Sequence, residues 1–240
     1  MLYVEGKDAR LLGKIGKLAG GSEFLSDSSV TLMKTDGFAN WTRVSTSAWV
    51  FNQFFEFEVK VASLFDRDYR TDSQVQEFID ELKGSDVLCF VLPFKEIENL
   101  LLVPEAIKKV VGKHTRGQLP VNWGARVEAI YEASLEGLKD QTSSNIVINS
   151  VQQEMKRKPN SNMHSVYTLA LEEFRKNWEQ PEFRRAKVGG KAAFSSIAKA
   201  VQDEFNVNLT ETRVIDEMTI ADVPVAVRDI FQSFEKFFRD

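Results

Sequence analysis

Residues 1–100 alternate short apolar runs with amphipathic stretches. Strands that alternate with helices in this way form βαβ units, and βαβ units build a mainly parallel sheet. In such a sheet the side chains that follow the strands gather at one edge, where α/β proteins bind their ligands. We therefore expect an α/β fold. The expected strands are 2–4, 30–33, 59–65 and 87–92, and the helices between them are 9–18, 40–55 and 72–82.

After Pro93 the pattern indicates helices only, which predicts a helical subdomain. Polar stretches at 141–145 and 156–162 are interpreted as connections between helices. A further helix is expected to follow Gly190. The four tryptophans fall in helical patterns and are expected in the core. The expected helices are 106–111, 123–138, 163–178, 189–205 and 225–238, and the tryptophans are Trp41, Trp49, Trp123 and Trp178.

Composition excludes several classes of protein. The net charge of −4 argues against a uniformly basic protein that coats nucleic acid. No apolar stretch approaches the roughly 20 residues that span a bilayer, so we expect no membrane segment. A single cysteine, Cys89, excludes a disulfide framework and a cysteine zinc site, and the N-terminus has no secretion signal. These features predict a cytoplasmic protein, and a strand at the very start suggests a piece of a longer chain.

The first chemical signal is an acid at the end of the first expected strand. Glu5 is followed by Gly6, which permits a tight turn, and then by Asp8. Glu5 would thus stand at the carboxyl end of the strand. The alternative is an ordinary strand-to-helix turn with Asp8 as the N-cap.

The second signal is a pair of aspartates after the third expected strand. Asp66 and Asp68 are one residue apart, and alternation along an extended chain would direct both to one side. Two neighbouring carboxylates repel unless a cation neutralises them. Oxygen ligands without cysteine suit Mg²⁺ or Mn²⁺ rather than zinc. The alternative is a solvated acidic turn paired with Arg67 and Arg70.

The third signal is a further acid pair, Glu96 and Glu98, which follows the fourth expected strand. It places two more carboxylates near a strand end. The alternative is the charged start of a short helix.

Together these motifs resemble the Toprim domain of the OLD (overcoming lysogenization defect) family of ATPase-nucleases. The resemblance is carried by VEGKD at Glu5, LFDRDYR at Asp66 and EIENLLL at Glu96, in the order and at the strand positions that the family requires. Gly190-Lys191 is similar to the glycine-lysine that precedes a helix in the family's nuclease portion. One position departs from the family: many members carry an acid where this chain has Ala9.

The resemblance implies a Rossmann-like Toprim core at 1–100, a helical insertion at 101–188 and a C-terminal segment at 189–240. It implies a metal-dependent endonuclease that nicks or cleaves DNA in phage defence, with one or two Mg²⁺ or Mn²⁺ ions. The chain has no Walker A signature, so a controlling ATPase would lie elsewhere in the full-length protein or in a partner subunit. The implied metal ligands are Glu5, Asp8, Asp66, Asp68, Glu96 and Glu98, and the implied catalytic residues are Glu5, Asp66, Asp68 and Lys191.

Substrate attraction would require local positive charge. Arg184, Arg185 and Lys187 are the candidates for contact with nucleic-acid phosphates, and the alternative is a solvated charged face. RNA is the alternative substrate, and a non-catalytic Toprim-like interaction or assembly module is the alternative function. A topoisomerase or primase is less favoured, because neither a nucleophilic-tyrosine domain nor a primer-synthesis framework is recognisable. Assembly into a homo-oligomer is left open.

Overall fold

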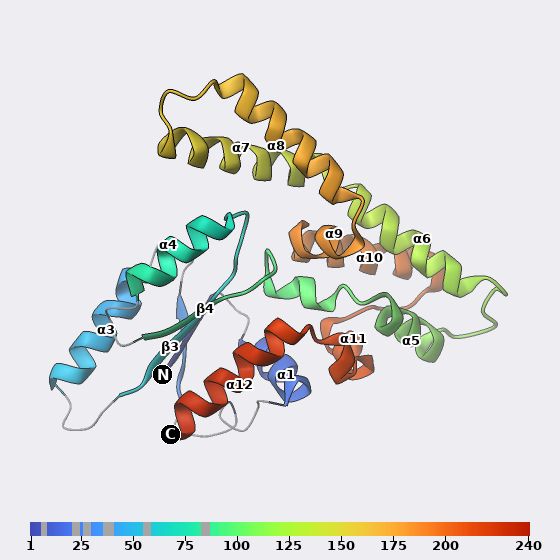
Figure 1. Ribbon diagram of the computed structural model, residues 1–240. Coiled ribbons are helices and arrows are strands. Elements are labelled where there is room, and N and C mark those ends of the chain that lie inside the picture. Colours follow the sequence, from blue (N-terminus) through green and yellow to red (C-terminus); the bar gives the residue numbers. More distant parts are fainter. Residues whose placement is uncertain (6–8, 21–24, 26–29, 36–40, 55–58, 83–86) are drawn as a thin grey trace. The chain divides into compact units, whose positions relative to one another are not determined.

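The computed structural model describes residues 1–5, 9–20, 25, 30–35, 41–54, 59–82 and 87–240 (Figure 1). The chain divides into two compact units. Unit 1 comprises Met1–Arg67, Asp72–Pro93 and Met218–Asp240, and unit 2 comprises Asp68–Thr71 and Phe94–Glu217. The expected C-terminal segment 189–240 is shared between the units, because residues 189–217 belong to unit 2 and Met218–Asp240 to unit 1.

Unit 1 contains a four-stranded parallel sheet in the order β2-β1-β3-β4, which confirms the expected α/β class. In register, Leu2 of β1 lies opposite Leu32 of β2 and Ala62 of β3. Each expected strand is present, with ends shifted by up to two residues. The strands are β1 (Leu2–Glu5), β2 (Leu32–Thr35), β3 (Val61–Phe65) and β4 (Val87–Val91).

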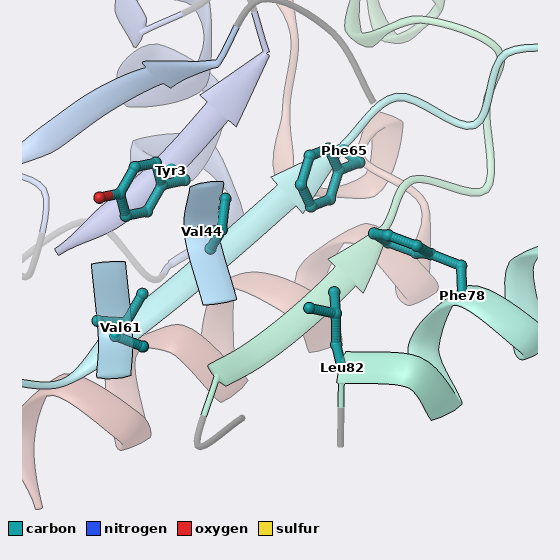
Figure 2. Close-up of a cluster of buried hydrophobic side chains, with 7 residues drawn as sticks. Tyr3, Val44, Val61, Phe65, Phe78 and Leu82 are labelled. Atoms are coloured by element: carbon teal, nitrogen blue, oxygen red, sulfur yellow. The ribbon is translucent and has the colours of Figure 1, made fainter. Parts of the chain in front are cut away.

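Helices α3 (Trp41–Phe54) and α4 (Asp72–Leu82) cover one face of this sheet. Figure 2 shows Phe78 and Leu82 of α4 directed at the strands, beside Phe65. The Phe65 and Phe78 rings meet edge to face, with centroids 5.3 Å apart. Burying one such ring stabilises the fold by about 1.5–3 kcal/mol. The prediction that Trp49 of α3 lies in the core is wrong, since the residue is 60% exposed.

Helices α1 (Ala9–Ala19) and α12 (Val225–Arg239) pack side by side in unit 1 (Figure 1). The ring of Phe234 in α12 meets that of Phe90 in β4, with centroids 5.2 Å apart. Phe90 alternates with the β4 residues that pack on the α3 and α4 side, so α12 covers the opposite face. Gly16 allows α1 to approach α12, because a Cβ there would lie 2.8 Å from the Phe231 ring.

Unit 2 consists of helices, and α7 and α8 form an antiparallel hairpin within it (Figure 1). The polar stretch 141–145, expected as a connection, lies inside α7 and that expectation is wrong. The first turns of α7 are polar, and only Thr142 and Val147 of the helix are buried, so its start is hard to distinguish from a connection. Packing against α8 stabilises the helix. The elements are η2 (Ile97–Leu101), α5 (Pro104–His114), α6 (Trp123–Glu136), α7 (Lys139–Arg157), α8 (Met163–Trp178), α9 (Pro181–Lys187), α10 (Gly190–Phe205) and α11 (Glu211–Glu217). Among the described residues, no helix is long and apolar enough to cross a membrane.

Candidate functional site

Glu5 and Asp66 meet at the carboxyl ends of adjacent strands in unit 1. Glu5 is the last residue of β1, and Asp66 directly follows β3. The backbone N–H of Asp66 donates to Glu5 Oε2 over 3.1 Å, although 61 residues separate the two. Asp66 is only 9% exposed. The parallel pairing of β1 with β3 thus brings together the first two acids that the sequence singled out.

Asp68 belongs to unit 2, and its backbone is not extended. Its φ of +51° lies in the left-handed region, which costs a non-glycine residue about 1–2 kcal/mol. Its N–H donates to the Lys95 carbonyl over 2.9 Å, and Arg70 pairs with its carboxylate over 2.8 Å. Alternation along a strand therefore does not relate Asp68 to Asp66, because the extended backbone ends before Asp68. The Arg70 contact matches the alternative of an acidic turn with arginine partners.

Helix α7 holds the short segment Asp68–Thr71. The side-chain amide of Asn149 donates to the Tyr69 carbonyl over 2.6 Å, and the Thr71 hydroxyl donates to Gln153. The Lys95 ammonium lies 5.1 Å from the centre of the Tyr69 ring, within cation–π distance. The sequence did not reveal these partners, because α7 itself was not expected.

Glu96 directly precedes η2, and its side chain contacts the first turn of α10. Its Oε2 accepts the backbone N–H of Lys191 over 3.0 Å, and its Oε1 pairs with the Lys95 ammonium. Burial alone would raise the pKa of Glu96, but the hydrogen bonds and the positive charge of the two lysines outweigh burial and lower it below the usual range. An N-terminal backbone N–H of a helix has no partner within the helix, so Glu96 acts as a cap supplied from another part of the chain.

Glu98 and Lys191 form the second contact between the same two segments. Lys191 Nζ lies 3.1 Å from Glu98 Oε1. The side chain of Glu98 is 6% exposed, whereas that of Lys191 is 65% exposed. Glu98 Oε2 is buried and has no hydrogen-bond partner in the described part of the chain. Unit 2 thus brings together Glu96, Glu98 and Lys191, three of the predicted site residues.

The remaining metal prediction concerns Asp8, which lies outside the described residues. The donor chemistry of the described acids suits a hard divalent cation, since every one offers carboxylate oxygens and Asp66 and Glu98 are buried. Within the described ranges, no three Asp, Glu, His or Cys side chains are grouped as a metal site. The prediction of a metal ion at these positions is therefore supported by the chemistry of the carboxylate donors and by no metal-like grouping among the described residues.

The three predicted phosphate contacts lie on α9. Arg184 pairs with Glu132, and its side chain is 17% exposed. Arg185 donates to the carbonyls of Asn99 and Leu100 over 3.5 and 3.4 Å. Lys187 is half-buried. Arg184 and Arg185 thus make contacts that stabilise unit 2. Contact with nucleic-acid phosphates would be a second role.

No protein-family model, curated protein or solved structure matches this chain.

Proposed function

We propose that this chain is the metal-dependent nuclease domain of a Toprim-type protein, cleaving or nicking the phosphodiester bonds of DNA. The observation that carries the proposal is the contact between Glu5 and Asp66. Neighbouring parallel strands place these acids together at the sheet edge where α/β proteins bind ligands. Carboxylate oxygens at such an edge suit a hard divalent cation such as Mg²⁺ or Mn²⁺.

Glu5 and Asp66 of unit 1 would hold the cation. Asp8, Asp68, Glu96 and Glu98 are the other acids that the Toprim resemblance implies as metal ligands. A bound Mg²⁺ or Mn²⁺ would lower the pKa of an attacking water and stabilise the leaving oxygen. Lys191 offers an exposed ammonium that a phosphate oxygen can reach, and Glu98 orients it. Positive charge held in this way stabilises the charge that develops on the phosphate.

The same chemistry would cleave RNA, so the preferred nucleic acid is part of the test. An ATPase region, in the same full-length protein or in a partner subunit, would control the activity in a cytoplasmic defence system. Assembly into a homo-oligomer would place more than one such domain on a substrate.

The test is incubation of the purified chain with supercoiled plasmid in Mg²⁺, Mn²⁺ or EDTA, followed by gel analysis of nicked and linear forms. We expect nicking that requires the metal and is abolished in Asp66→Asn, which keeps the side-chain volume. Asp140→Asn is the matched control, because Asp140 is an exposed acid on α7. A parallel incubation with single-stranded RNA separates the two substrates. Absence of metal-dependent cleavage of both would favour the non-catalytic assembly module.

A further inference from the structure

The side-chain amide of Asn99 is fully buried in unit 2 and bonds through both of its ends. Asn99 is 0% exposed. Its Oδ1 accepts the backbone N–H of Glu96 over 2.9 Å. Its Nδ2 donates to the carbonyls of Arg185 over 2.7 Å and Val188 over 2.9 Å. A buried amide with good partners at both ends holds them at one separation, because releasing either would leave a buried polar group unsatisfied.

Asn99 therefore joins two segments that are distant in the sequence. One is the turn that carries Glu96 and Glu98, and the other is the end of α9 with the residue that precedes Gly189 and α10. Arg185 reinforces the junction, since its side chain donates to the Asn99 carbonyl while its own carbonyl accepts from Asn99.

Gly190 shows how closely these segments approach. A Cβ at Gly190 would lie 2.6 Å from both the backbone nitrogen and Oδ1 of Asn99, and 2.9 Å from the carbonyl carbon of Glu98. Backbone atoms that are already hydrogen-bonded cannot yield to such a contact, so only glycine fits there. This approach brings the Lys191 N–H to Glu96 and the Lys191 ammonium to Glu98.

We propose that Asn99 is a positioning residue whose buried amide, with Gly190 against it, sets the place of Lys191 beside the Glu96 and Glu98 carboxylates. The inference rests on the proposed function, in which Lys191 meets the phosphate. Asn99 itself does not touch substrate. It acts through the backbone of the α10 start, and a displacement of about 1 Å at a charge-stabilising group is enough to cost about a hundredfold in rate.

The first experiment measures amide hydrogen exchange and does not depend on activity. Asn99→Asp keeps the volume and the acceptor but replaces the two donated bonds by repulsion between oxygens. Gly190→Ala disturbs the same contact from the other side. In both variants the Lys191 amide should exchange about tenfold faster or more, the scale of one lost hydrogen bond.

The control for exchange is Ser134→Ala. It removes the bond from Ser196 to the Ser134 hydroxyl, which is 3.1 Å long and joins α10 to α6 away from Gly190. Lys191 exchange should be unchanged in this variant. Unchanged exchange in both Asn99→Asp and Gly190→Ala would overturn the positioning role. If Asn99→Asp does not fold, as judged by its circular dichroism, Gly190→Ala decides the outcome.

The second experiment measures single-turnover cleavage at saturating Mn²⁺ in a double-mutant cycle. Asn99→Asp should lower the cleavage rate of the otherwise wild-type chain by about tenfold to a hundredfold. It should not lower the rate of the Lys191→Ala chain any further. An equal slowing in both backgrounds would mean that Asn99 only stabilises the fold. If the wild-type chain cleaves no nucleic acid, the proposed function fails, and the exchange result alone decides whether Asn99 positions Lys191.

Discussion

The backbone N–H of Lys191 donates to the Glu96 carboxylate over 3.0 Å, although 95 residues separate the two. This contact gives the two acids of the Glu96–Glu98 pair different surroundings. Glu96 Oε2 caps a helix, and its Oε1 is paired with Lys95. Glu98 keeps a buried oxygen without a hydrogen-bond partner among the described residues. Glu98 is therefore a better candidate for a metal ligand than Glu96.

Glu96 should make the stability of the chain depend on pH in the acid range. Its folded pKa is lowered from the ordinary 4.5, so the stability that it contributes is present above about pH 4.5. That contribution is lost as the pH falls through the folded pKa. Glu96→Gln should lower the free energy of unfolding by about 1 kcal/mol at pH 7 and by less at pH 3. Urea unfolding at the two pH values measures this, with the exposed Glu172→Gln as the control. An equal loss at both pH values would contradict the capping role.

Lys191→Ala should retain cation binding and slow single-turnover cleavage by about a hundredfold or more. The interaction strengthens only as charge develops on the phosphate, so it acts on the chemical step. Lys191→Arg should recover the rate only partly, because a planar guanidinium does not replace a compact ammonium. Rates at the wild-type level in the alanine variant would redirect attention to Lys95, whose ammonium lies against Glu96 and the Tyr69 ring.

The double change Asp66→Ala with Asp68→Ala should remove Mn²⁺ binding and leave a folded chain, because the Asp68–Arg70 ion pair that is lost is partly exposed and such pairs contribute only about 0–1 kcal/mol. Isothermal titration calorimetry measures the affinity. The two single variants separate the acids, since Asp66 is buried beside Glu5 and Asp68 is paired with Arg70. We expect Asp66→Ala alone to weaken binding by about tenfold or more. An unchanged Mn²⁺ affinity in the double variant would remove the metal assignment.

Replacing Arg184, Arg185 and Lys187 together by alanine should weaken nucleic-acid binding on every sequence. If all three meet phosphates, the slope of log affinity against log salt should fall by up to about three phosphate equivalents. Arg185→Ala should also lower the free energy of unfolding by about 1 kcal/mol, because it loses its bonds to two backbone carbonyls. A lowered stability with an unchanged salt slope would assign these residues to the fold alone.

Cys89 should react slowly with thiol reagents in the folded chain. Burial raises the pKa of its thiol from 9.0 to about 11, so the reactive thiolate is about a hundredfold scarcer at pH 8 than in the unfolded chain. Alkylation followed by mass spectrometry in buffer and in urea compares the two states. Equal rates would show that β4 opens readily.

The sequence by itself determined the sheet and the position of its first acids. Apolar runs such as Val61–Phe65 and the helical patterns between them are local signals, and a parallel sheet is the expected arrangement of strands that alternate with helices. Glu5 and Asp66 were thus expected at the carboxyl ends of two strands of one sheet. The strand order that puts β1 beside β3 and brings the two residues into contact was not predicted and comes from the structure.

Only the tertiary structure decided the conformation and the partners of the other candidate site residues, Asp68 and Glu96. Asp68 turns into the left-handed region where Lys95 and Arg70 hold it, and α7 forms from a polar sequence because α8 packs against it. Glu96 becomes a helix cap only because the Asn99 amide and the absence of a side chain at Gly190 bring α10 onto its turn. Local periodicity does not encode such contacts, since each depends on partners tens of residues away that meet only when the whole unit has packed.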